Sequence, residues 1–64
     1  MGEYGTFAER LESVAADIDD VAFDRLREAV ADGETTRSSE DRELMKARRA
    51  IEKAIQVLRQ LDGA

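Results

Sequence analysis

The stretch that decides the fold lies in the C-terminal third of the chain, where residues 44–61 read LMKARRAIEKAIQVLRQL. Apolar residues recur there at steps of three and four, which places them along one side of an α-helix. The pattern predicts a helix over residues 39–61 that begins at Ser38 or Ser39, with acidic residues in its first turn where they suit the helix dipole. The expected buried residues are Leu44, Ala47, Ile51, Ala54, Ile55, Leu58 and Leu61.

A second helix is predicted upstream, over residues 7–32. Thr6 has the character of an N-cap, and Glu9 follows it at the spacing of a capping box. Behind this cap, apolar residues again recur at helical steps, and Gly33 provides a stop because glycine readily takes the positive φ of a helix C-terminus. The apolar stripe consists of Phe7, Leu11, Val14 and Ile18.

The continuity of this upstream helix is open at Asp19. A second apolar stripe, formed by Phe23, Leu26 and Val30, is rotated relative to the first, and Asp19 could cap a new helix that carries it. A break would give two short helices, whereas a continuous helix would have a buried side that drifts along its length. The absence of proline and the run of alanines favour the continuous helix.

The sequence therefore predicts a single all-α domain over residues 1–64, an antiparallel helical hairpin with a connecting loop at 33–38. Two helices cannot enclose a core, and a chain of 64 residues buries only about 60% of its unfolded surface. We expect a homodimer that forms a four-helix bundle. The alternative is a monomeric three-helix bundle that uses the break at Asp19.

The amino-acid composition limits which reactive groups and metal ligands the chain can offer. The chain contains no histidine and no cysteine, so a disulfide is impossible and the usual zinc ligands are missing. No histidine can activate a serine, and the carboxylates of Asp20, Asp24 and Glu28 follow a spacing that is typical of a solvated helix face. We expect no enzyme activity, no cofactor and no metal.

Basic residues form a stripe on the C-terminal helix. Residues 1–34 carry ten acids and three bases, whereas residues 35–64 carry five acids and seven bases. Four of these bases recur at helical spacing, opposite the predicted buried side: Arg42, Lys46, Arg49 and Lys53. A solvated face, an electrostatic contact with an acidic protein surface, and contact with nucleic-acid phosphates all fit this basic stripe.

The functional expectation is a non-enzymatic protein–protein interaction or regulatory module. Met45 and Val57 lie off the predicted buried side and are candidates for partner contact, together with the basic stripe. The alternative is a small nucleic-acid-associated protein that uses the stripe, although no helix-turn-helix spacing supports it. The chain shows no targeting segment and no apolar run of membrane-spanning length, so we expect a cytoplasmic protein without membrane contact.

Overall fold

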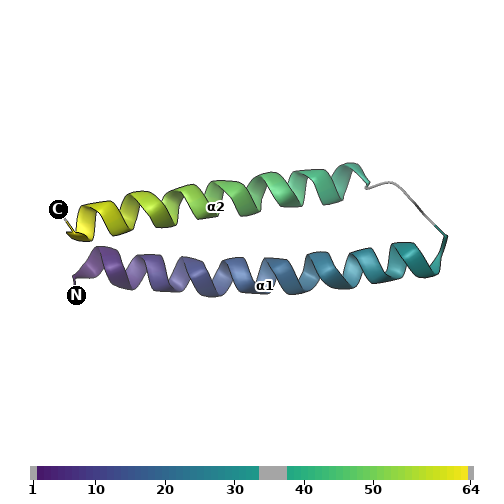
Figure 1. The fold of residues 1–64 in the computed structure, drawn as a ribbon, viewed down its shortest axis with the longest axis horizontal. Coiled ribbons are helices and arrows are strands. Elements are labelled where there is room, and N and C mark those ends of the chain that lie inside the picture. The colour runs from purple at the N-terminus through teal and green to yellow at the C-terminus, as the bar shows by residue number, and fades with distance from the viewer. Residues whose placement is uncertain (1, 34–37, 64) are drawn as a thin grey trace.

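The computed structural model describes residues 2–33 and 38–63, which form two helices packed side by side (Figure 1). α1 covers Glu3–Ala31 and α2 covers Ser39–Gly63. The pair measures 48 × 15 × 12 Å, and both chain ends lie at the same end of it. The predicted antiparallel helical hairpin is confirmed, while residues 34–37 of the predicted loop lie outside the described residues.

The start of α1 differs from the prediction. The helix begins at Glu3 with Gly2 as its cap residue, and Thr6 lies in the first turn, where its backbone N–H donates to the Gly2 carbonyl. The Thr6 N-cap prediction is therefore wrong. The end of α2 holds this earlier start, because the Gly2 N–H donates to Asp62 Oδ1 at 3.0 Å. A Cβ at Gly2 would approach that oxygen to 2.8 Å, so glycine suits the close contact.

α1 runs without interruption through Asp19. The Asp19 carboxylate does not cap a new helix but accepts hydrogen bonds from the Arg48 guanidinium of α2, at 3.0 and 3.3 Å. Helix propensity therefore prevails at a site that has no glycine or proline to break the backbone. The alternative three-helix bundle is wrong, because the break that it requires does not form.

The helix ends beside the connection follow the expected capping chemistry. Gly33 takes a φ of +83°, and its N–H donates to the Val30 carbonyl at 3.0 Å, which closes the end of α1. Ser38 caps α2, since its Oγ accepts a hydrogen bond from the Asp41 N–H at 3.1 Å. At its other end α2 continues to Gly63, two residues beyond the predicted end at 61.

The seam is the line along which the two helices face each other. α1 contributes small residues at every seventh position, Ala8, Ala15, Ala22 and Ala29, of which the first two are buried and the others half-buried. α2 contributes larger residues at alternating steps of three and four, with Ile55 buried at 5% exposure. The α2 seam residues are Asp41, Leu44, Arg48, Ile51, Ile55, Leu58 and Asp62. The alanines let the helices approach closely, and α2 fills the space between them.

Several predicted core residues lie outside this seam. Phe7 is 43% exposed, Phe23 60% and Leu61 51%, and Val14 and Ala47 are exposed as well. A seam between only two helices covers one narrow stripe on each, so the neighbouring apolar stripe stays open to solvent. Among the described residues, the buried apolar side chains are Ala8, Ala15 and Ile55.

Candidate self-association surface

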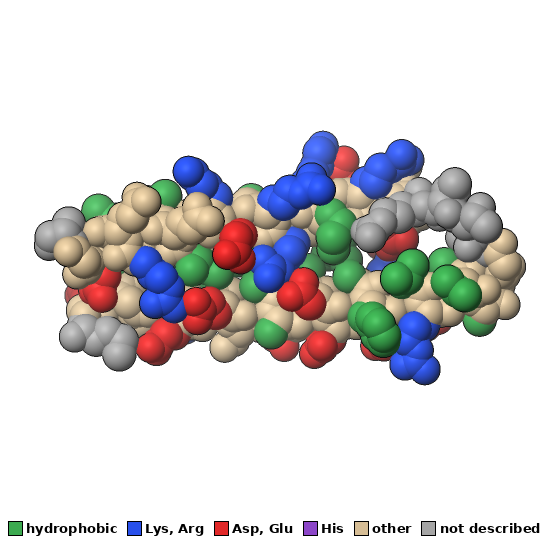
Figure 2. All heavy atoms as spheres, viewed as in Figure 1, with side chains coloured by type: hydrophobic (Ala, Val, Ile, Leu, Met, Phe, Trp, Pro, Cys, Tyr) green, Lys and Arg blue, Asp and Glu red, His purple; other side chains and the backbone are tan. Residues whose placement is uncertain are grey.

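One flank of the seam is closed by ion pairs, and we call it the ion-paired face. Arg59 of α2 reaches across to Glu12 of α1, while Arg48 contacts Asp19 at 3.0 Å and Glu52 at 2.8 Å. Figure 2 views the hairpin from this side, with acidic side chains gathered mainly along α1 and basic ones along α2. The pairs are partly solvated, since the Arg59 and Glu12 side chains are each 50% exposed.

These contacts tune charges without creating a reactive group. Hydrogen bonding to Asp19 raises the pKa of Arg48, and hydrogen bonding to Glu12 raises the pKa of Arg59. Near the connection, the hydrogen bond from Arg25 lowers the pKa of Asp41. Each shift favours the form that is already charged at neutral pH, so none prepares a general acid or base.

The other flank of the seam is apolar along residues 7–21 of α1 and 47–61 of α2, and we call this part the apolar face. Nearer the connection the same flank carries the ion pair between Arg25 and Glu40, at 3.0 Å. With about 100° of rotation per residue, Glu12 and Asp19 lie to one side of the α1 alanines, whereas Phe7, Val14 and Val21 lie to the other side. The same sense of rotation on α2 places Glu52 and Arg59 with the ion pairs. Because the two helices are antiparallel, residues that are rotated away from the seam in the opposite sense lie together on the remaining flank, whether they come from α1 or from α2.

The α2 half of the apolar face is a stripe of uncharged residues at steps of three, four, three and four: Ala47, Ala50, Ala54, Val57 and Leu61. The α1 half carries larger side chains, of which Val14 is 44% and Val21 51% exposed. Sequence reasoning missed this division because it treated each helix as having one buried side. The signal that could have revealed it is the second set of three-and-four steps on each helix.

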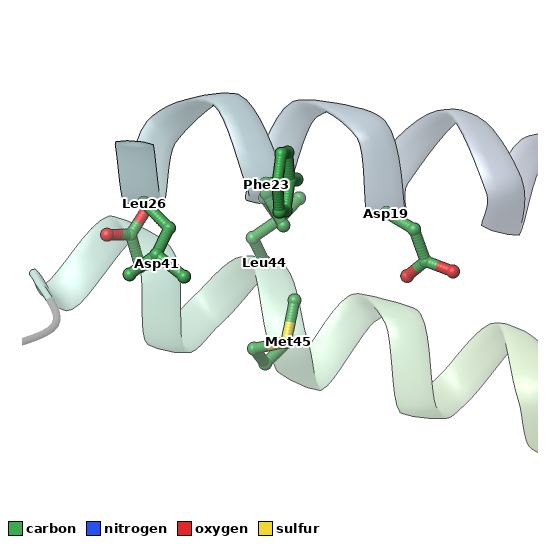
Figure 3. A pocket seen from close by; sticks show the side chains of 7 residues that line it. Asp19, Phe23, Leu26, Asp41, Leu44 and Met45 are labelled. Carbon is green, nitrogen blue, oxygen red and sulfur yellow. The ribbon is translucent and has the colours of Figure 1, made fainter. Parts of the chain in front are cut away.

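A separate hollow lies at the connection end of the ion-paired face (Figure 3). Its volume is ≈ 240 Å³, and Phe23 and Leu26 line it from α1 while Leu44 and Met45 line it from α2. Arg27 stands 5.9 Å from the centre of the Phe23 ring, within range of a cation–π contact. The apolar stripe of the second half of α1 thus faces a different flank from that of the first half.

The candidate contact residues predicted from sequence fall on different surfaces. The basic stripe, Arg42, Lys46, Arg49 and Lys53, is exposed along α2, and Lys46 pairs with Glu43 at 3.2 Å. Val57 belongs to the apolar face and is 41% exposed, whereas Met45 is half-buried in the hollow. The structure therefore does not bring these six residues together into one site.

The described ranges 2–33 and 38–63 also bear on two other kinds of site, a metal site and a membrane span. No group of three acidic side chains there is arranged to hold a metal ion, and neither helix is long and apolar enough to cross a membrane. Comparison of the chain with protein-family models, curated proteins and solved structures gives no match. The surfaces of the hairpin are therefore the features that indicate a function.

Proposed function

We propose that this protein is a non-enzymatic association module whose hairpin pairs with a second copy through the apolar face. The product would be a four-helix bundle made of two chains. The observation that carries the proposal is the distribution of apolar side chains: one set is buried or half-buried in the seam, while a second set of large side chains lies exposed on the apolar face.

The single hairpin leaves large apolar side chains partly exposed, and burying them in an interface would be favourable in free energy. Full burial of a Val, Leu or Phe side chain contributes about 1.5–3 kcal/mol, so covering a half-exposed one would contribute about 1 kcal/mol. The apolar face offers at least five such side chains: Phe7, Val14, Val21, Val57 and Leu61. Covering these side chains would add to the apolar area that the single hairpin already buries in its seam.

The dimensions also suit such a pairing. The apolar face covers residues 7–21 of α1 and 47–61 of α2, about 21 Å or four turns of each helix, on a hairpin that is 48 Å long. The ion-paired face is a poor alternative because pairing there would remove water from several charged groups. A second copy therefore fits the apolar flank, and leaves the charged flank in solvent.

The test is the mass in solution, measured by light scattering over a range of protein and salt concentrations. We expect a mass of two chains for the protein itself and a mass of one chain for Val14→Lys, which places a charge in the apolar face. The matched control is Ser13→Lys, an exposed neighbour outside that face, which should retain two chains. A folded single chain for the unmodified protein at high concentration would overturn the proposal.

A second candidate function is nucleic-acid association through the basic stripe. The observation in its favour is that four exposed cations follow one side of α2, which could supply about four phosphate contacts. Binding to duplex DNA that weakens with salt, and that is lost in Arg49→Glu/Lys53→Glu while the helical content stays unchanged, would support this function. Equal retention of both proteins, or of neither, would remove it.

A further inference from the structure

We propose that in the pair α1 of each hairpin packs antiparallel against α2 of the other, rather than each helix against its own copy. This inference rests on the proposed self-association and adds the arrangement of the partner. Two twofold arrangements can bring the apolar faces together with all neighbouring helices antiparallel. An axis parallel to the helices sets α1 on the partner's α2, whereas an axis across the helices sets α1 on α1 and α2 on α2.

We call the arrangement with α1 on the partner's α2 unlike pairing, and the arrangement with each helix on its own copy like pairing. The shapes of the two helices favour unlike pairing. On the apolar face α1 presents large side chains, Phe7, Val14 and Val21, while most of the facing α2 stripe is alanine. Large side chains on one helix fill the shallow surface that small ones leave on another, as ridges fit grooves. Like pairing would set the α1 helices far apart and the α2 helices close together, so the two layers could not keep an even separation.

Charge favours the same arrangement. The outer edge of α1, beside its apolar residues, carries Asp17 and Asp24 as well as Arg10, whereas the outer edge of α2 carries Lys46 and Lys53. Unlike pairing places these acids along these bases, and like pairing places acids along acids and bases along bases. Lys53 makes no ion pair within the described part of the chain, and the Lys46–Glu43 pair is about 70% exposed on both sides, so both lysines are accessible.

The hairpin contacts also set the register. Gly2 is level with Asp62, and Asp19 is level with Arg48, because each pair is joined by hydrogen bonds. Val14, which lies between Gly2 and Asp19 along α1, is therefore level with the α2 turn of residues 50–54. A twofold axis parallel to the helices preserves this level, so Val14 would face Ala50 and Ala54 of the partner chain.

Disulfide trapping tests the arrangement, and the chain has no cysteine of its own to interfere. The Val14→Cys and Ala54→Cys proteins would be unfolded together, refolded as a mixture and oxidised. A second mixture would combine Val14→Cys with Ala50→Cys, which lies on the same turn of α2. The matched comparison mixes Val14→Cys with Val21→Cys, because like pairing brings these two positions of α1 together about the helix centre. A disulfide forms only between positions whose Cα atoms lie within about 7 Å.

We expect a cross-linked dimer from Val14→Cys with Ala54→Cys or Ala50→Cys, in at least several-fold excess over the Val14→Cys and Val21→Cys mixture. The reverse ratio, or no cross-link with either α2 position, would overturn the inference. The mass of the reduced mixtures separates this failure from that of the proposed function. Two chains with the wrong cross-link refute only the arrangement, whereas a single chain for the unmodified protein refutes both.

Discussion

The two flanks of the seam differ in the side chains that border them, which are charged on one flank and apolar on the other. On the ion-paired face, Arg48 and Arg59 extend across the seam to acidic residues of α1, which leaves charged groups in contact with water. On the apolar face, side chains such as Val14 and Leu61 stand about half exposed. One flank is bridged within a single chain, and the other is the surface that we propose a second copy covers.

This difference follows from the chemistry of each flank. A partly solvated ion pair needs water around it and contributes little to the stability of the hairpin. Contiguous exposed apolar patches are a feature of contact surfaces, which is why we propose self-association through this flank. In the proposed pair each hairpin would supply half of a larger core, and its own seam would set the geometry of that half.

Ile55→Ala should have the largest effect on stability. Ile55 is the large side chain that is buried in the seam, at 5% exposure, and its truncation leaves a cavity between the helices. We expect a loss of about 2–5 kcal/mol in the free energy of unfolding, measured by urea denaturation and far-ultraviolet circular dichroism. Gln56→Ala, its exposed neighbour, is the control and should leave the transition almost unchanged. Equal midpoints for the two variants would remove Ile55 from the seam.

Ala15→Leu should have the next largest effect, because it overfills a buried position of the seam. Ala15 is 3% exposed, whereas its neighbour Ala16 is exposed on the same helix. We expect Ala15→Leu to cost about 1–3 kcal/mol and Ala16→Leu to change stability far less, because both substitutions have the same helix propensity. The comparison uses thermal unfolding at a fixed protein concentration. A larger loss for Ala16→Leu would mean that the seam is wrongly placed on α1.

Much of the fold could be predicted from sequence. The periodicity of residues 44–61 predicts α2, Gly33 predicts the end of α1, and Ser38 predicts the start of α2, because capping and periodicity are local properties. The N-terminal boundary could not be predicted in this way. Thr6 has the right local chemistry for a cap, but the contact between Gly2 and Asp62 joins the two chain ends and is invisible to local reasoning.

The candidate surface was harder to predict for a related reason. The predicted stripe is divided in the structure: Leu11 and Ile18 are half-buried beside the seam alanines, whereas Phe7 and Val14 are exposed. A hydrophobic pattern shows which residues avoid water, but the choice between two adjacent apolar stripes depends on how closely the helices can approach. Small residues at every seventh position, which look like simple helix propensity in the sequence, decide that choice.

Arg48→Met should have the smallest effect of the three substitutions, and it tests whether the ion-paired face holds the helices together. Met retains most of the apolar stem that Arg48 places in the seam and removes only the contacts with Asp19 and Glu52. Because exposed ion pairs contribute little, the urea midpoint should move much less than in Ile55→Ala. The remaining difference from the unmodified protein should shrink as salt is added, since salt screens charges at the surface. A loss as large as that of Ile55→Ala, and insensitive to salt, would show that the charged flank rather than the apolar seam sets the geometry of the hairpin.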